Sequence, residues 1–131
     1  MELSIHHTAI IASDYQAARA FYVEKLGLPV ISERFRPERG DWKIDLRVGD
    51  SRIELFVIPN APPRPSYPEA RGLRHLAFRV EDMEAAVRQL EERGIPCESV
   101  RVDPYTGCRF TFFKDPDGLP LELYEQKNSS E

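Results

Sequence analysis

Apolar side chains recur along the first half of the chain at spacings that predict a strand, a helix and three further strands. Residues 4–12 (SIHHTAIIA) are apolar and β-branched, as in a buried strand. Over residues 13–27, apolar side chains recur every three or four positions between an N-capping Ser13 or Asp14 and a final Gly27, which is typical of a helix. The remaining strands are expected at residues 29–35, 42–48 and 51–58.

The same order of elements returns after a proline-rich segment. Residues 59–72 contain five prolines, which suits a linker better than a helix or a central strand. The chain is therefore predicted to consist of two βαβββ modules, residues 4–58 and 73–126, joined by this linker. In the second module we expect a strand, a helix and three strands at residues 73–80, 81–94, 95–102, 108–114 and 119–126, followed by a frayed tail at 127–131.

Comparison of the sequence with itself supports a duplicated module. At an offset of 68 residues, identical residues coincide at His7/His75, Ala9/Ala77, Asp14/Asp82, Glu54/Glu122 and Leu55/Leu123. The chain contains only three histidines, so the coincidence of two of them at the repeat offset favours a shared role.

Each module carries a histidine on its first strand and a glutamate on its fourth, 47 residues further on. Both glutamates have apolar neighbours that should face the helix, so the carboxylates should point to the other face of the sheet. Burying a carboxylate without a partner is costly, and a shared cation removes that cost. We therefore predict that His7, Glu54, His75 and Glu122 bind one divalent ion of the Zn, Ni, Co, Mn or Fe group.

The adjacent His6 has no histidine counterpart, because Arg74 occupies the position 68 residues later. Side chains alternate between the faces of a strand, so His6 is expected to point away from His7. Its removal should leave metal binding nearly intact.

Composition narrows the class of protein. With 41% hydrophobic and 31% charged residues among 131, the chain is expected to be one soluble domain. No apolar run is long enough to span a membrane, and no signal peptide is recognisable, so we expect a cytoplasmic protein without a membrane partner. The net charge of −4 argues against nucleic-acid binding. Two cysteines are too few for a disulfide framework.

The segments FYVEKLGLP and KDPDGLPLEL, together with the repeated histidine and glutamate positions, resemble the vicinal-oxygen-chelate superfamily. That superfamily includes glyoxalase I, ring-cleaving dioxygenases, methylmalonyl-CoA epimerase and bleomycin-binding proteins. The resemblance runs from IHHTAIIASD to DPDGLPLELYE and implies an α+β fold in which two βαβββ modules form an open, curved, barrel-like sheet around a metal. It further implies a homodimer. The four predicted ligands fall on the ligand positions of the bacterial glyoxalase I pattern.

This pattern implies a metal-dependent lyase that converts the hemithioacetal of a 2-oxoaldehyde, such as methylglyoxal, into a 2-hydroxyacyl thioester. Glu122 or Glu54 would be the catalytic base, and Glu122 is preferred. The small-molecule substrate is expected to contact Arg109, Tyr105, Trp42 and Lys43, with Arg79 as a further candidate.

Two positions depart from the glyoxalase I pattern. An arginine and an asparagine that hold glutathione are replaced here by Ile11 and Ile58. The resemblance therefore implies either another thiol or another substrate.

Other functions of the same fold remain open at this point. A ring-cleaving dioxygenase requires two histidines and a single carboxylate, so the fourth ligand Glu54 counts against it. An epimerase usually has a glutamine at the position of Glu54. A small-molecule binding or resistance protein needs no metal, which would leave the repeated set of four residues unexplained.

Overall fold

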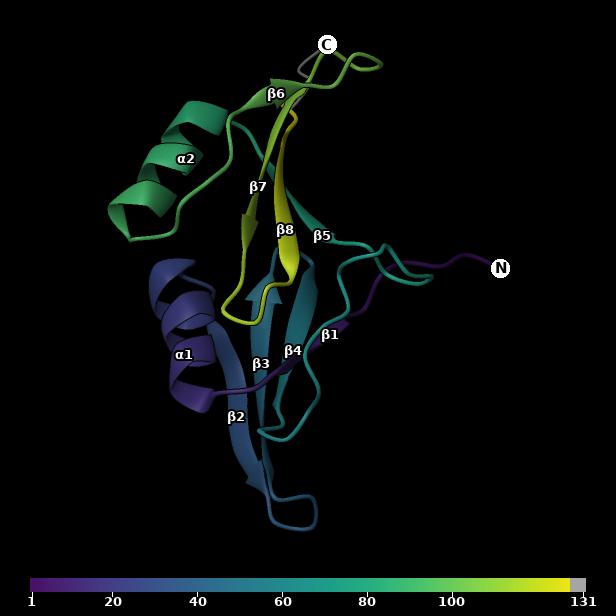
Figure 1. The fold of residues 1–131 in the computed structure, drawn as a ribbon, viewed down its shortest axis with the longest axis vertical. Helices are drawn as coiled ribbons and strands as arrows, with labels where there is room; N and C mark the ends of the chain where they lie inside the picture. Colours follow the sequence, from purple (N-terminus) through teal and green to yellow (C-terminus); the bar gives the residue numbers. More distant parts are fainter. Residues whose placement is uncertain (128–131) are drawn as a thin grey trace. The chain divides into compact units, whose positions relative to one another are not determined.

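The computed structural model of the chain describes residues 1–127, so most of the tail expected at 127–131 lies outside the described residues. The chain divides into two compact units, Met1–Pro63 and Arg64–Glu131. The division falls inside the proline-rich segment. Each unit contains one four-stranded sheet and one helical segment, which makes the protein an α+β protein (Figure 1).

The first unit has the predicted strand, helix and three-strand order. Its strands have the spatial order β1-β4-β3-β2, in which β1 is parallel to β4 and the other pairs are antiparallel. The helical segment is an α-helix continued by a π-helical turn, a departure from the single helix predicted. The bounds are β1 Thr8–Ala12, α1 Tyr15–Arg19, π-turn η1 Ala20–Lys25, β2 Val30–Arg36, β3 Asp41–Val48 and β4 Ser51–Val57.

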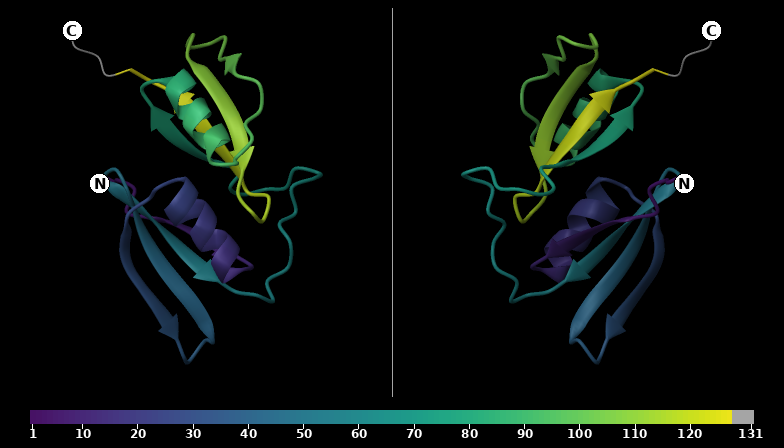
Figure 2. Two further views of the ribbon diagram at one scale, coloured as in Figure 1. Left: turned by 90° about the vertical axis from the view of Figure 1, so that its left-hand side faces the viewer. Right: turned by 90° about the vertical axis from the view of Figure 1, so that its right-hand side faces the viewer.

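The second unit repeats this arrangement with the spatial order β5-β8-β7-β6 and with β5 parallel to β8. In both units the helix covers one face of its own sheet (Figure 2). The bounds are β5 Leu76–Val80, α2 Met83–Glu92, β6 Arg101–Val102, β7 Arg109–Lys114 and β8 Pro120–Glu125.

Both helices begin at the aspartates that the repeat aligns. A carboxylate oxygen of Asp14 accepts a hydrogen bond from the Ala17 amide at 2.8 Å, and Asp82 accepts one from Ala85 at 3.1 Å. Such bonds satisfy an amide that the helix itself leaves unpaired. The prediction of Asp14 as an N-cap is confirmed.

Two predicted strands are shorter in the structure. The first begins at Thr8, so His6 and His7 precede it. The strand predicted at 95–102 is reduced to Arg101–Val102. Pro96 has no amide hydrogen to donate, and contact with β7 is limited to Glu98, whose amide donates to the Phe112 carbonyl at 2.9 Å and whose carbonyl accepts from the Thr111 hydroxyl at 2.7 Å.

The core of each unit lies between sheet and helix. In the first unit Ala18 of α1 packs against Ala12 and Val57, and Ile53 and Leu55 of β4 are at most 2% exposed. In the second unit Met83, Leu121 and Leu123 are buried, and so are Phe113 and Leu90. The opposite face of each sheet carries the alternating residues, which include the glutamates Glu54 and Glu122 as well as the aromatic residues Phe56, Phe110 and Phe112. Within residues 1–127, no helix has the length and apolar character needed to cross a bilayer.

Candidate metal and substrate site

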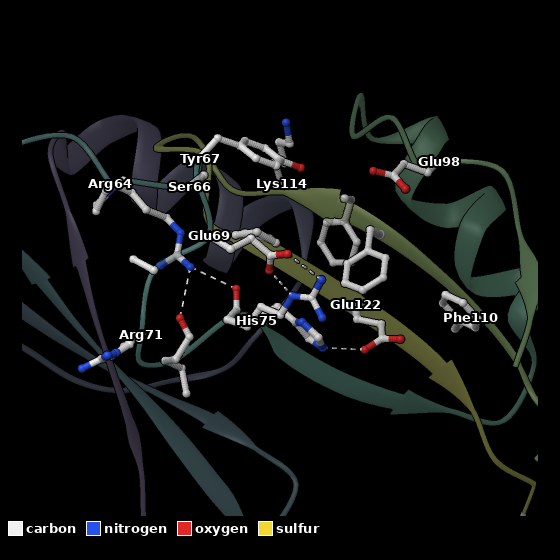
Figure 3. A pocket seen from close by; sticks show the side chains of 18 of the residues that line it. Arg64, Ser66, Tyr67, Glu69, Arg71, His75, Glu98, Phe110, Lys114 and Glu122 are labelled. Carbon is white, nitrogen blue, oxygen red and sulfur yellow. Dashed lines mark hydrogen bonds and ion pairs between the residues drawn. The ribbon is translucent and has the colours of Figure 1, made fainter. Parts of the chain in front are cut away.

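The second unit brings its predicted histidine and glutamate into contact. Glu122 lies on β8 between the buried Leu121 and Leu123, so its side chain points to the face opposite the helix. His75 directly precedes β5, the parallel neighbour of β8. The Nε2 atom of His75 lies 2.9 Å from Oε1 of Glu122, and Figure 3 shows the two side chains turned toward one another.

The first unit makes the corresponding pair. Glu54 lies on β4 between the buried Ile53 and Leu55, and His7 directly precedes β1. The Nδ1 atom of His7 lies 3.6 Å from Oε2 of Glu54. The register also repeats, because Ala9 stands opposite Glu54 as Ala77 stands opposite Glu122.

The expected direction of the His6 side chain, away from His7, is wrong. Its Nδ1 atom lies 2.8 Å from Nδ1 of His7, and the two rings meet edge to face with centroids 5.1 Å apart. Strand alternation does not apply here, because both residues precede the first regular strand residue, Thr8. His6 is therefore a neighbour of the predicted ligand His7.

Different residues surround the two pairs. Opposite Glu54 on the neighbouring strand stands Asp45, which is 7% exposed and accepts a hydrogen bond from the Ser32 hydroxyl at 3.1 Å. Lys43 lies between the two carboxylates, with Nζ 3.6 Å from Oε1 of Glu54 and 3.4 Å from Oδ1 of Asp45. The first pair thus belongs to a charged cluster.

Opposite Glu122 stands an aromatic residue, Phe112, whose ring meets that of His75 edge to face at a centroid distance of 5.0 Å. Phe110 follows on the same face, 6.1 Å from Phe112. The second pair therefore borders an aromatic surface. The two modules therefore present the same donor types, imidazole and carboxylate, in different surroundings.

The second pair opens into a pocket of about 690 Å³ formed within the second unit. The segment 64–74 lies along one side of this pocket, and strands β7 and β8 supply the other (Figure 3). The Arg64 guanidinium fastens the segment by donating to the Leu73 and Arg74 carbonyls at 3.2 and 3.0 Å. The pocket volume suits a small organic molecule.

The donor chemistry of the pairs fits a divalent transition-metal ion. Imidazole nitrogens and carboxylate oxygens are ligands that Zn, Ni, Co, Mn and Fe accept. The carboxylates are mostly buried, with side-chain exposures of 13% for Glu54 and 11% for Glu122. Among the residues that the structure describes, no group of three or more His, Cys, Asp or Glu side chains is arranged to hold a metal ion. Each unit contributes two of the four predicted ligands.

The structure brings only some of the predicted substrate contacts to these faces. Lys43 lies beside Glu54, and Arg79 shares a face with Glu122, because it stands opposite Tyr124 in the ladder. Trp42 is turned to the helix side, where its ring packs against Tyr15. It is therefore not brought together with the pairs.

Arg109 and Tyr105 are also placed away from the pairs. The Arg109 guanidinium donates to Glu125 through Nε and Nη2, both at 2.9 Å, and to Glu84 of α2 at 3.1 Å. The hydrogen bonds that Glu125 accepts from Arg109 and from the Met83 amide lower its pKa to about 2. Tyr105 lies in the loop before β7 and is almost fully exposed.

Sequence comparison agrees with this architecture. A family model of the Glyoxalase/Bleomycin resistance protein/Dioxygenase superfamily matches residues 4–123, and the chain belongs to this superfamily. It is 60% identical over 124 residues to the uncharacterized protein YwkD of Bacillus subtilis, which covers 94% of this chain and 97% of that protein. A glyoxalase family protein from Enterococcus faecalis has a crystal structure with a TM-score of 0.88 and 57% identity, covering 93% of this chain and 97% of that chain.

Enzymes of known reaction are among the more distant relatives. Lactoylglutathione lyase from Agrobacterium tumefaciens matches with a TM-score of 0.65 and 27% identity, over 93% of this chain and 92% of that chain. Ethylmalonyl-CoA/methylmalonyl-CoA epimerase of Cereibacter sphaeroides is 32% identical over 94 residues, covering 69% of this chain and 70% of that protein.

Proposed function

We propose that this protein is a divalent-metal-dependent lyase or isomerase related in chemistry to glyoxalase I. The observation that carries the proposal is the pair of His–Glu contacts, His75 with Glu122 at 2.9 Å and His7 with Glu54 at 3.6 Å, in repeated register. Unrelated surface ion pairs are not expected to recur with the same residue types and the same strand partners. The four side chains act as ligands of one metal ion.

In the proposed reaction, residues of this chain bind the metal ion and transfer the proton. His7 and His75 offer ring nitrogens, and Glu54 and Glu122 offer carboxylate oxygens. A divalent ion bound by them supplies Lewis-acid stabilisation of an oxyanion on a substrate that presents two neighbouring oxygens. One glutamate then removes a proton from the carbon beside these oxygens and returns it to the adjacent carbon.

Glu122 is the better candidate for the base. Its neighbourhood contains the aromatic surface of Phe112 and the pocket that can hold a substrate. Glu54 is instead paired with Lys43 within a charged cluster, so its carboxylate is already engaged by an ammonium group. Glu54 is accordingly the ligand that stays in place.

The thiol partner of the reaction is proposed to differ from glutathione. Ile11 is 56% exposed, and neither it nor Ile58 can donate a hydrogen bond to a carboxylate of the tripeptide. Relatives at 27% and 32% identity include a lactoylglutathione lyase and a CoA-thioester epimerase. The epimerase is the second candidate function, since it too moves a proton beside a carbonyl group.

The decisive experiment measures metal content and activity together. The protein is purified without added metal and analysed by elemental mass spectrometry. It is then loaded with Ni²⁺, Zn²⁺, Co²⁺ or Mn²⁺ and assayed with methylglyoxal and glutathione, bacillithiol or free cysteine, and separately with methylmalonyl-CoA. We expect one metal ion per chain and turnover in at least one assay.

Matched variants separate the enzyme from a binding protein. Glu122→Gln should abolish turnover, whereas Glu81→Gln, an exposed carboxylate outside the pocket lining, should not. The proposed function is excluded if the protein binds no metal with micromolar affinity or better and Glu122→Gln has the same activity as the wild type. A metal-free binding protein would then be favoured. The proposal includes a homodimer, for which light scattering should give twice the chain mass.

Mixing two inactive variants distinguishes sites within one chain from sites shared by two chains. His7→Ala disables the first module and His75→Ala the second. If each site combines modules of two chains, a mixed dimer contains one intact site and activity returns on mixing. If each site lies within one chain, the mixture stays inactive.

A further inference from the structure

The pocket beside His75 and Glu122 is positively charged, in contrast to the chain as a whole. The chain has 18 Lys and Arg against 22 Asp and Glu. Three glutamates line the pocket, Glu69, Glu98 and Glu122. Five basic residues line it, namely Arg64, Arg71, Arg74, Arg101 and Lys114. A cavity lined by an excess of one sign of charge concentrates ligands of the opposite sign.

Two of these cations bracket an aromatic surface. Strand β7 presents Phe110, Phe112 and Lys114 on one face, because side chains of alternate residues share a face. At the other end, the Cζ atom of Arg101 from β6 lies 4.9 Å from the Phe110 ring centroid and 5.8 Å from that of Phe112. The edge of His75 meets the same Phe112 ring. Phe112 therefore has a guanidinium and a predicted metal ligand as neighbours.

The Arg101 guanidinium remains available for a ligand. The cation–π contacts involve the face of the group over the rings, so its N–H groups can donate to an anion once the Glu98 contact is exchanged. Its ion pair is with Glu98, three residues earlier, at 3.3 Å, and both side chains are more than half exposed. Exposed pairs of this kind contribute little and exchange easily. Lys114, at the other end, forms no ion pair or hydrogen bond with the residues described.

We propose that this pocket recognises an anionic group, a carboxylate or a phosphate, on a small and partly apolar substrate. Arg101 binds the anion, Phe110 and Phe112 contact the apolar part, and Lys114 adds charge at the opposite end. The inference rests on the proposed function, because it assigns a substrate class to the same site. It concerns the second module alone, and anion binding here does not require the metal.

The test titrates three probes that share a phenyl ring into the full-length ¹⁵N-labelled protein after treatment with EDTA. Benzoate and phenylphosphonate carry the two candidate anions, and benzamide is a neutral analogue of benzoate. Amide shifts of residues 64–74 and of β7 report binding. We expect both anions to bind at least about fivefold more tightly than benzamide, a difference of about 1 kcal/mol. The stronger of the two anions identifies the preferred group.

Substitutions test which side chains are responsible for the tighter binding of the anions. Arg101→Gln should weaken both anions by about fivefold or more and leave benzamide unchanged, while Arg101→Lys should restore part of the affinity. Arg88→Gln removes the same charge from the exposed surface of α2 and should change nothing. The inference is overturned if benzamide binds as tightly as benzoate, or if Arg88→Gln weakens anions as much as Arg101→Gln. Because metal is absent throughout, this result is independent of whether the lyase proposal succeeds.

Discussion

The Nε2 atom of His75 lies 2.9 Å from a carboxylate oxygen of Glu122, and both side chains point away from the helix of their module. The contact exists because β5 and β8 are parallel neighbours whose register puts the residue two positions after His75 opposite Glu122. The same register recurs 68 residues earlier. The duplication thus repeats the His–Glu contact in both modules, and if all four side chains bind one metal ion as proposed, loss of either histidine should weaken metal binding.

The first prediction concerns the two histidines. His7→Ala and His75→Ala should each weaken Zn²⁺ or Co²⁺ affinity by more than about 100-fold, since the loss of even an outer-shell partner costs about 10–100-fold. Competition against a chromophoric chelator measures this. A large loss in one variant and none in the other would contradict the use of both modules in a single site.

His6→Ala is predicted to have an intermediate effect. The imidazole of His6 lies 2.8 Å from Nδ1 of His7 and can fix the orientation of that ring. Its removal should therefore lower metal affinity by up to about tenfold, as for a partner that orients a ligand. The chelator competition used for His7→Ala gives the comparison, and an effect of His6→Ala equal to that of His7→Ala would make His6 a ligand in its own right.

The fourth-strand glutamates should differ in catalysis. Glu122→Gln should lower kcat by about 10²–10⁴-fold, the range that a positioned base contributes, with a smaller loss of metal affinity. Glu54→Gln should act chiefly on metal affinity, so excess metal should restore part of its rate. Steady-state kinetics at saturating Co²⁺ checks both variants, and rescue of Glu122→Gln alone would reverse the assignment.

Much of the fold could be predicted, because the periodicity of apolar residues indicates helices and strands, and the sequence repeat indicates two similar modules. The repeat predicted equivalent positions for His75 and Glu122 on the first and fourth strands, but their direct contact depends on the parallel pairing of β5 with β8. Strand alternation could also have separated Trp42 from Lys43, because neighbouring strand residues face opposite sides. Trp42 indeed lies on the helix side, whereas Lys43 lies beside Glu54.

Other features of the site depend on which strands become neighbours. Asp45 enters the first cluster only because β3 pairs with β4 in the register that places it opposite Glu54. Arg101 reaches the aromatic surface because β6, only two residues long, pairs with β7. No local pattern specifies such cross-strand partners, so these residues were missed. Strand pairing also explains why Arg109 does not lie beside the His–Glu pair, because its guanidinium donates to Glu125 on the helix side of the sheet.

Stability should depend on pH through Glu125. Hydrogen bonds from Arg109 and from the Met83 amide lower its pKa from 4.5 to about 2. A depressed carboxyl pKa contributes stability that is fully present above the unfolded value and is lost as the pH falls toward the folded value. Glu125→Gln should thus be less stable than the wild type at pH 7, and the difference should shrink between about pH 5 and pH 2.

Urea unfolding at a series of pH values measures this difference. Glu92→Gln is the matched control, because it removes the same charge from an exposed position at the end of α2. A Glu125→Gln deficit that stays constant down to pH 2 would mean that the Arg109 interaction does not depend on the charge of the carboxylate.

The last prediction concerns Lys43, which lies 3.6 Å from Glu54 and 3.4 Å from Asp45. Its ammonium group competes with a metal ion for the Glu54 carboxylate, so Lys43→Gln should increase metal affinity about fivefold, or by about 1 kcal/mol. Asp45→Asn should act in the opposite direction, because it removes a nearby negative charge and leaves Lys43 to pair with Glu54 alone. Isothermal titration with Zn²⁺ should show these opposite signs, and the Arg88→Gln control should show no change. If both substitutions shift the affinity in the same direction, Lys43 acts through a group other than the Glu54 carboxylate.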